Sequence, residues 1–318
     1  MKKFAIVVSA YLLLLAILVG TLNLVYVQLE LPRNEIYKFW SMPEHITICN
    51  FGSSHGRKAF CYDDFAPDTS FNFGLTSQKL SYDFRLMQYY ADRIDPGADI
   101  LITISYFSLF GVTDETEQEG FLSKNRRYYR ILSDEYIKEY DRRTDIYENL
   151  FPALINLDDT VTVLTGQKHD DNQEWFHTAY EIDIEENADL KYQNHIVRGS
   201  LDEDGEIAIN EAEVTALYDM IDFCREHGWH PYLITPPYTE QYLSRIRDNS
   251  PGFLESFDRF VRDIADEKGV PYYNYGQDER FSGDIGLFID ADHMNIDGAK
   301  KFTAALMAEI PGLAEEDP

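Results

Sequence analysis

Short apolar runs alternate with segments of helical periodicity along most of this chain. Runs rich in β-branched and aromatic residues predict five strands, at residues 45–51, 69–73, 98–104, 231–235 and 270–274. Apolar positions at helical spacing predict helices at 77–93, 211–227, 252–268 and 297–310, and another from about residue 57. Strands that alternate with helices favour a parallel, doubly wound sheet. We therefore expect a flavodoxin-like, three-layer α/β/α fold.

The first residues follow a different pattern. After Lys2 and Lys3, an uncharged and mostly apolar run extends from Phe4 to Val27, which is long enough to cross a bilayer as a helix. Lysines before the run place the N-terminus in the cytoplasm and the rest of the chain outside the cell membrane, extracellular or periplasmic. A cleaved signal peptide is the alternative, but no small-x-small cleavage site follows the run.

These patterns divide the chain into three parts. Residues 1–27 form a cytoplasmic stub and a transmembrane signal anchor, and residues 28–44 form a connector interrupted by prolines. Residues 45–318 form the folded domain. Within it the alternation loosens at about 111–210, where charges and tyrosines are dense, and this stretch is read as a mainly helical insertion or cap.

Composition narrows the classes of partner. The chain has 318 residues, 44% of them hydrophobic, so it can bury a full core. With 28 basic and 56 acidic residues its net charge is −28, which disfavours nucleic acid and anionic lipid surfaces as partners of the folded part, although solubility alone is sufficient to explain the charge. Three cysteines without a CxxC pair indicate neither a zinc site nor a disulfide framework. Buried thiols are expected, with a Cys49–Cys61 bridge as the alternative.

Two short motifs near opposite ends of the domain carry candidate chemistry. Ser54 lies on a glycine turn, Gly52-Ser-Ser-His-Gly56, directly after the first strand of the domain. Asp290 and His293 form a D-x-x-H pair before the last helix. A serine hydroxyl attacks at neutral pH only when a base removes its proton and a carboxylate fixes that base, so the chain supplies one candidate for each role.

The turn fits G-x-S-x-G, the nucleophile elbow of α/β-hydrolases, but that family places several strands before its elbow. The order found here resembles instead the SGNH (GDSL-like) hydrolase superfamily. The resemblance covers about residues 45–110 and 211–310. It implies that Ser54 is the nucleophile, His293 the general base and Asp290 the residue that orients it. It also implies an oxyanion hole formed with the amides of Ser54 and Gly74.

The third family block departs from the pattern. The family normally has an asparagine after the third strand, whereas this chain reads Thr-Ile-Ser-Tyr-Phe-Ser at 103–108. Either Ser105 substitutes for it, or the amides of Ser54 and Gly74 are the only donors that remain. Losing one donor from an oxyanion hole costs on the order of 10²–10³ in rate, so hydrolysis could be weak. Membrane-anchored SGNH relatives that acylate or deacylate surface polymers look similar in this respect, among them relatives of the D-alanyl-lipoteichoic acid and exopolysaccharide O-acetylation proteins.

Several residues near the motifs have more than one interpretation. Asp292 could replace Asp290 as the orienting residue. Asp290 is favoured, because Asp292 is adjacent to His293 and an extended loop would turn its side chain away from the ring. His55 and Asn72 are candidates for substrate contact, with solvent exposure as the alternative for His55. Asn295 is expected to cap the last helix. His169, His177 and His195 lack the spacing of metal ligands, so neither a metal nor another cofactor is expected.

These observations favour an outward-facing serine esterase or O-acyltransferase that acts on cell-surface polysaccharide or teichoic-type polymers. Its partners would be such a polymer as acceptor, a membrane-bound acyl-donor protein, and the membrane through the N-terminal helix. The alternative is an inactive SGNH domain that binds glycan or serves as a scaffold. A secreted lipase is a third interpretation, which the predicted anchor disfavours.

Overall fold

The computed structural model describes residues 1–111, 125–165 and 183–313. The chain forms two compact units. The first comprises Met1–Ser41 with Glu119–Gln173, and the second comprises Met42–Gln118 with Glu174–Pro318. The expected domain boundaries at residues 28, 44, 111 and 210 stay predictions.

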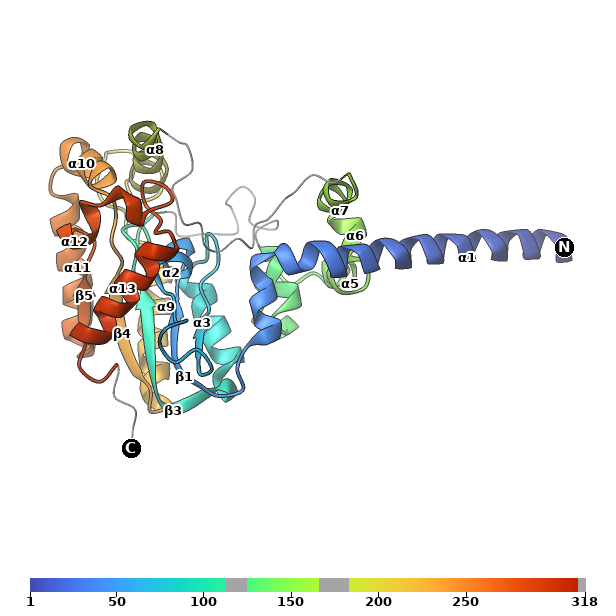
Figure 1. Ribbon diagram of the computed structural model, residues 1–318, viewed down its shortest axis with the longest axis horizontal. Helices are drawn as coiled ribbons and strands as arrows, with labels where there is room; N and C mark the ends of the chain where they lie inside the picture. Colours follow the sequence, from blue (N-terminus) through green and yellow to red (C-terminus); the bar gives the residue numbers. More distant parts are fainter. Residues whose placement is uncertain (112–124, 166–182, 314–318) are drawn as a thin grey trace. The chain divides into compact units, whose positions relative to one another are not determined.

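The second unit contains a five-stranded, all-parallel sheet in the order β2-β1-β3-β4-β5 (Figure 1). The strands are β1 (Ile46–Phe51), β2 (Ser70–Asn72), β3 (Ile94–Thr103), β4 (His230–Thr235) and β5 (Tyr272–Asn274). In register, Phe51 lies opposite Ile102, and Thr103 lies opposite Ile234. The chain order reverses between β1 and β3, which is where doubly wound sheets form their crevice. The predicted α/β class and five-stranded parallel sheet are confirmed.

Helices cover both faces of this sheet (Figure 1). They are α2 (Ser54–Ala59), α3 (Leu80–Tyr89), α9 (Glu211–Glu226), α10 (Glu240–Asn249), α11 (Phe253–Lys268), α12 (Glu279–Ser282) and α13 (Ile296–Glu309). On one face, Phe302 of α13 packs in a core that includes Ile48, Leu101 and Ile234 from three neighbouring strands. These strand positions point the same way because side chains alternate along a strand. The core therefore fixes α13, and with it the loop that precedes the helix.

Several predicted elements differ from the structure. Helix α10 was not predicted; Thr239 caps it and its apolar side chains Tyr242 and Ile246 are buried. Strand β3 begins at Ile94, four residues early, because it continues through Pro96 and Gly97, residues that usually end strands. Helix α2 begins at Ser54 rather than near residue 57.

The first unit begins with the apolar helix α1 (Lys2–Val25), which continues as a π-helix over Tyr26–Glu30. No residue of α1 is buried, and the helix is long and apolar enough to cross a membrane. The predicted N-terminal apolar helix is thus present. The side of the membrane on which the second unit lies stays a prediction.

The rest of the first unit is helical in the described residues. It includes the 3-10 helices Glu35–Ser41 and Arg126–Arg130, and the helices α5 (Arg142–Leu150), α6 (Pro152–Ile155) and α7 (Leu157–Leu164). The predicted insertion also extends to α8 (Ile184–Lys191), which belongs to the second unit. A largely helical character for the insertion is therefore observed in its described part.

Buried ion pairs hold the first unit together. Arg127 lies 2.7 Å from Glu35, and Glu148 of α5 pairs with Arg126 at 2.6 Å and with Arg130 at 3.5 Å. Buried pairs of this kind are costly to break singly, because the remaining charge then lacks a partner. They tie the segment after α1 to the helices at 126–150.

The three cysteines, Cys49, Cys61 and Cys224, are all buried and none forms a disulfide. The prediction of buried thiols is confirmed, and the alternative, a Cys49–Cys61 disulfide, is not formed. Burial raises the pKa of the Cys49 thiol well above its usual value. These thiols are therefore poor nucleophiles at neutral pH.

Candidate active site at the carboxyl ends of β1 and β3

A tight turn places Ser54 directly after β1. Gly52 has φ +144°, and its N–H donates to Asp83 Oδ1 at 2.9 Å. A Cβ at Gly52 would lie 2.6 Å from Thr103 Cβ, so the turn packs closely against β3. Ser53 is the N-cap of α2, because its Oγ accepts from the His55 amide at 3.4 Å. The capping task thus falls to Ser53 and leaves the Ser54 hydroxyl for another partner.

That partner is His293. The Nε2 of His293 lies 2.8 Å from Ser54 Oγ, although the two residues are 239 positions apart in the sequence. Asn295 fixes the end of the histidine loop, since its Oδ1 accepts from the Gly298 amide at 2.9 Å and caps α13 as predicted. The Ile289 amide also donates to the carbonyl of His293 at 2.9 Å. The loop is therefore anchored on both sides of the imidazole.

Asp290 accepts from the other ring nitrogen. The Nδ1 of His293 lies 2.9 Å and 3.0 Å from the two carboxylate oxygens of Asp290. Asp290 Oδ1 also accepts from the amides of Asp292 and His293, at 3.0 Å and 2.8 Å. The same carboxylate therefore shapes the loop and holds the imidazole with Nε2 toward Ser54. The structure brings Ser54, His293 and Asp290 together in the order of a Ser-His-Asp arrangement.

A second carboxylate, that of Asp292, also contacts Nδ1 of His293. Its Oδ1 is 2.9 Å from His293 Nδ1 and 2.6 Å from the Nζ of Lys191, at the end of α8. Its Oδ2 is 3.0 Å from His195 Nδ1 and 3.3 Å from His55 Nε2. The Asp292 side chain is fully buried, so these four neighbours replace the water that would otherwise solvate its charge.

Lys191 contacts the orienting carboxylate as well. Its Nζ lies 3.0 Å from Asp290 Oδ2 and 3.2 Å from His293 Nδ1. One partly buried ammonium therefore bridges both carboxylates beside the imidazole. Sequence reasoning missed Lys191 and assigned His195 no role, because both come from the insertion and nothing in its spacing shows that it folds back onto the sheet.

Electrostatics set the protonation states in this cluster. Burial alone would lower the pKa of His293, but the carboxylates of Asp290 and Asp292 outweigh it and raise that pKa above its ordinary value. Burial would raise the pKa of Asp292, yet His293 and Lys191 hold it well below its usual range. Burial also opposes the charge of Lys191, but Asp292 and Asp290 raise its pKa. The two carboxylates and the ammonium are therefore charged at neutral pH.

His55 has the opposite shift. Burial and the neighbouring His293 lower its pKa to about 4, so this ring is neutral at neutral pH. It stacks on the His293 ring with centroids 4.5 Å apart and is 2% exposed. The exposed alternative for His55 is therefore wrong, because the side chain packs against the ring of His293 rather than toward solvent. Its contact with substrate stays a prediction.

The expected oxyanion donors are not all free in this structure. The N–H of Gly74 donates to Asn72 Oδ1 at 2.9 Å, so this amide is engaged within its own turn. Ser105 is fully buried at the end of β3, and its N–H donates to Ser108 Oγ at 2.9 Å. The roles of Gly74 and Ser105 in an oxyanion hole stay predictions.

Asn72 is occupied by the backbone. Its Nδ2 donates to the carbonyls of Arg57 at 3.0 Å and of Gly56 and Phe60 at 3.3 Å. These bonds tie β2 to α2, the helix that begins at Ser54. Asn72 therefore has a structural role, and its expected contact with substrate stays a prediction.

Two groups of side chains have the donor types of a metal site. His55, His195 and Asp292 place their donor atoms within 4.8 Å of one another, and so do Asp290, Asp292 and His293. The ammonium of Lys191 already lies 2.6 Å from Asp292, where it supplies the positive charge that a metal ion would bring. The two other histidines considered at the sequence level, His169 and His177, lie outside the described residues.

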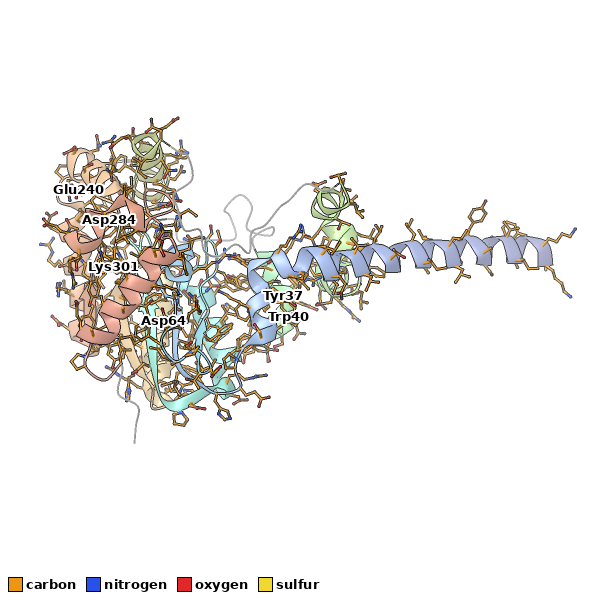
Figure 2. All side chains as sticks on the ribbon, in the orientation of Figure 1. Tyr37, Trp40, Asp64, Glu240, Asp284 and Lys301 are labelled. Carbon is orange, nitrogen blue, oxygen red and sulfur yellow. The ribbon has the colours of Figure 1, made fainter. Side chains whose placement is uncertain are left out.

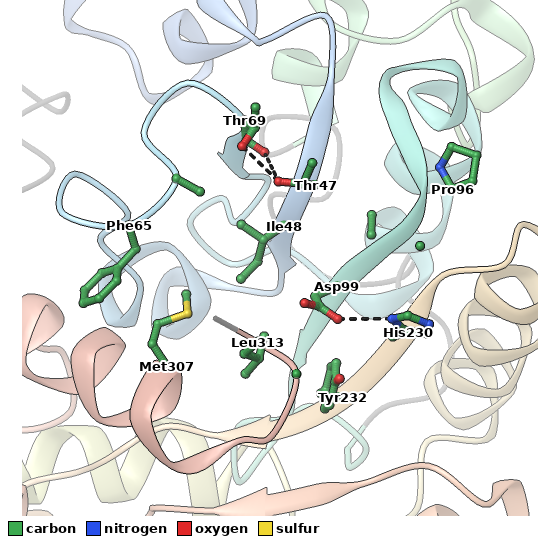
Figure 3. Close-up of a pocket in the computed structure, with 14 residues that line it drawn as sticks. Thr47, Ile48, Phe65, Thr69, Pro96, Asp99, His230, Tyr232, Met307 and Leu313 are labelled. Carbon is green, nitrogen blue, oxygen red and sulfur yellow. Dashed lines mark hydrogen bonds and ion pairs between the residues drawn. The ribbon is translucent and has the colours of Figure 1, made fainter. Parts of the chain in front are cut away.

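A cavity of about 840 Å³ lies at the other end of the sheet (Figure 3). It is bordered by the amino ends of β1, β3 and β4, with Thr47, Asp99 and His230 among its lining residues. His230 Nδ1 lies 3.4 Å from Asp99 Oδ1. Because parallel strands all run the same way, this cavity and Ser54 lie at opposite ends of the sheet and are separate features.

Comparisons with known proteins add little to this picture. No family model matches the chain, and no curated protein does. Among solved structures, one similar chain is a Bacteroides fragilis protein described as a "putative acylhydrolase". It is 11% identical, the match covers 87% of this chain and 93% of that one, and the TM-score is 0.38. A similarity at that level supports no argument about activity, so the functional proposal rests on the geometry of the site.

Proposed function

We propose that the protein is a membrane-anchored serine esterase or O-acyltransferase of the SGNH type, with Ser54 as nucleophile. The observation that carries the proposal is the contact of Ser54 Oγ with His293 Nε2 at 2.8 Å, with Nδ1 of the same ring held by Asp290 at 2.9 Å. A hydroxyl, an imidazole and a carboxylate in this order form the arrangement that activates serine in unrelated hydrolases.

In the proposed reaction, Ser54 Oγ attacks the carbonyl carbon of an acyl ester while His293 Nε2 takes the hydroxyl proton. The ester C–O bond then breaks, and His293 returns the proton to the departing alcohol, which leaves an acyl-serine. A second hydroxyl attacks this acyl group with His293 again as base. Ser54 recovers its proton as it leaves. Water as the second hydroxyl gives hydrolysis, and a glycan or polyol hydroxyl gives transfer.

The charge balance of the cluster fits this role. With His293 neutral, Asp290, Asp292 and Lys191 sum to one negative charge. When His293 accepts the serine proton, the imidazolium completes two carboxylate–cation pairs in a buried site. Charges that are fixed before the reaction stabilise the charge that develops in it.

The proposed substrates are acyl esters of surface polysaccharide or teichoic-type polymers, with a membrane-bound acyl-donor protein as partner. This part rests on the resemblance and on α1, a helix able to hold the protein at a membrane. A catalytically weak domain that binds glycan is the second candidate. It is favoured by the engaged Gly74 amide and by the absence of an asparagine from residues 103–108.

A fluorophosphonate probe separates the two candidates. We expect the full-length protein in detergent to be labelled and the Ser54→Ala and His293→Ala variants to lose labelling. Ser53→Ala is the matched control, because it removes the neighbouring hydroxyl, which caps α2, and should keep the label. Absence of labelling in the unmodified protein would favour the glycan-binding candidate. Products formed from p-nitrophenyl acetate with and without glycerol would then show whether water or a polyol is the preferred acceptor.

A further inference from the structure

The helices α5, α6 and α7 of the first unit expose many large apolar side chains. Seven of them are between 39% and 61% exposed: Ile146, Tyr147, Leu150, Leu154, Leu157, Val161 and Leu164. Soluble monomers seldom expose so many apolar side chains on consecutive elements, and such surfaces commonly mark contact with a protein or a membrane. This surface is called the α5–α7 face below.

The exposed residues recur at helical spacing. In α7, Leu157, Val161 and Leu164 are four and then three residues apart, so they lie on one side of the helix. In α5, Ile146 and Leu150 are four residues apart. Asp158, which follows Leu157 around the α7 helix, is exposed and acidic. The pattern is that of amphipathic helices with the apolar side turned outward.

Hydrogen bonds attach these helices to α1 near its C-terminal end. Asn23, near the end of α1, donates through Nδ2 to the carbonyl of Leu150 at 2.8 Å. Its Oδ1 accepts from the amide of Ala153 in α6 at 3.3 Å. Figure 1 shows α5, α6 and α7 gathered beside this end of α1. The apolar surface of α1 and the α5–α7 face therefore belong to neighbouring elements of one unit.

The level of Asn23 matches a bilayer interface. From Lys3 to Asn23 an α-helix rises about 30 Å, which equals the hydrocarbon thickness of a typical bilayer, about 30 Å. If Lys3 lies at one interface, Asn23 lies at the other. Helix α6 bonds directly to Asn23, so the α5–α7 face is held where headgroups meet acyl chains.

The aromatic residues and the charge of the first unit are those of a segment that meets a membrane interface. Tyr37 and Trp40 are stacked 6.0 Å apart and are 41% and 52% exposed (Figure 2). Tyrosine and tryptophan are enriched at membrane interfaces. Residues 1–41 and 119–173 hold 12 basic and 13 acidic residues, whereas the rest of the chain holds 16 and 43. The first unit is therefore nearly neutral and tolerates anionic headgroups, which the rest would repel.

We propose that the α5–α7 face is a second membrane contact, which lies in the headgroup region of the bilayer that α1 crosses. The occupant of the face is phospholipid, with Leu157, Val161 and Leu164 at the acyl boundary. Apolar side chains on helices held parallel to the interface bind lipid in this way. The proposal rests on α1 crossing a bilayer and is independent of the chemistry at Ser54.

The test measures lipid exposure in the full-length protein reconstituted in nanodiscs of phosphatidylcholine and phosphatidylglycerol. A nitroxide is attached to a single cysteine at residue 157, 161 or 164, with residue 158 as the matched polar control on the same helix. Collisions with oxygen, which dissolves in lipid, are compared with collisions with a nickel chelate, which stays in water. The native cysteines are buried, and the unsubstituted protein gives their background. Thermal unfolding by circular dichroism confirms that each labelled variant is folded.

We expect nitroxides at residues 157, 161 and 164 to collide more often with oxygen, relative to the nickel chelate, than nitroxides at residue 158 or at Leu190 do. Leu190 is an exposed leucine of the second unit. A label at Leu12, midway along α1, reports whether α1 lies in lipid. The proposal would be overturned if the label at Leu12 collides mainly with oxygen while the labels at the three α7 positions collide mainly with the nickel chelate. The α5–α7 face would then be exposed to water or covered by protein. A water-like Leu12 would overturn its premise as well. Neither outcome affects the labelling of Ser54, so the functional proposal is tested separately.

Discussion

At the scale of single residues, one imidazole lies among two carboxylates and one ammonium. His293 Nδ1 is 2.9 Å from a carboxylate oxygen of Asp290 and of Asp292, so distance alone does not separate them. Their backbone contacts distinguish the two carboxylates. Asp290 also accepts from two amides of the loop, whereas Asp292 pairs mainly with Lys191 and with the imidazoles of His55 and His195. Asp290 therefore positions the ring, and Asp292 adjusts its charge.

The first prediction separates these two carboxylates. Asp290→Asn should lower the rate of ester hydrolysis by roughly 10³–10⁴, because an amide favours the wrong tautomer of His293 and disturbs the loop. Asp292→Asn should cost less, since Asp290 still holds Nδ1. The measurement is kcat/KM for p-nitrophenyl acetate. A larger loss in Asp292→Asn than in Asp290→Asn would reverse the assignment.

The second prediction concerns pH. His293 must be neutral to take the serine proton, and its pKa is raised, so kcat/KM should rise with pH through a value above the ordinary 6.5. Asp292→Asn removes a nearby negative charge and should move this rise to lower pH. Lys191→Met removes a positive charge that lowers the pKa of His293 and should move the rise to higher pH.

The readout for this prediction is the midpoint of kcat/KM against pH in the three proteins. Opposite shifts in the two variants are required, because a general loss of structure would lower the rate without moving the midpoint in opposite directions. His55, stacked on the ring, titrates near pH 4 and should not contribute to the rise. Shifts of the same sign in both variants would contradict the electrostatic account.

At the scale of elements, the position of Ser54 depends on a close approach between a turn and a strand. Gly52 combines a positive φ with a packing distance to β3 that leaves no space for a Cβ. Gly56 adds a second close approach, since a Cβ there would lie 2.7 Å from Thr103 Oγ1. The short connection between β1 and α2 is possible because both positions lack side chains.

Gly52→Ala should lower the free energy of unfolding by about 2–4 kcal/mol, because it adds backbone strain to a clash with Thr103. Gly97→Ala is the matched control, since Gly97 also has a positive φ, +83°, but nothing within 4 Å of its would-be Cβ. It should cost only about 1–2 kcal/mol. Denaturant unfolding of both variants measures the difference. Equal costs would show that the contact with Thr103 contributes nothing.

Much of this architecture could be predicted from local patterns. Apolar runs identified all five strands, and the parallel pairing of β1 with β3 explains why Ser54, after β1, and Ser105, after β3, lie at the same edge of the sheet. The resemblance of the D-x-x-H pair to the SGNH pattern implied that Asp290 orients His293, and the two side chains are in contact at 2.9 Å in the structure. Helix α10 was missed although Thr239 offered a cap signal.

Other parts of the site could not be predicted from spacing. Lys191 and His195 are about 100 residues from His293, and only the folding of α8 against the sheet unit brings them to it. For His55 the sequence left substrate contact and solvent exposure open, because a polar side chain beside a glycine turn has no burial signature of its own. The structure buries it beside Asp292, whose Oδ2 lies 3.3 Å from His55 Nε2.

At the scale of the whole molecule, charge is divided unequally between the two units. Nearly all of the net charge of −28 belongs to residues 42–118 and 174–318, where 43 acidic residues face 16 basic ones. Like charges on this unit disfavour contact with an anionic membrane surface. The membrane-compatible residues are therefore concentrated in the first unit, and the candidate active site belongs to the second.

The last prediction tests orientation across the membrane in intact cells. Lysines precede α1, so the N-terminus should stay in the cytoplasm and the second unit should lie outside. Single cysteines at Asp64 and Glu240, both exposed on the second unit (Figure 2), should react with a membrane-impermeant maleimide before lysis. A cysteine at Lys3 should react only after the membrane is permeabilised. The buried native thiols limit background labelling. The reverse pattern would place Ser54 in the cytoplasm, where surface polymers are out of reach, and would exclude the proposed substrates while leaving the chemistry of the serine untouched.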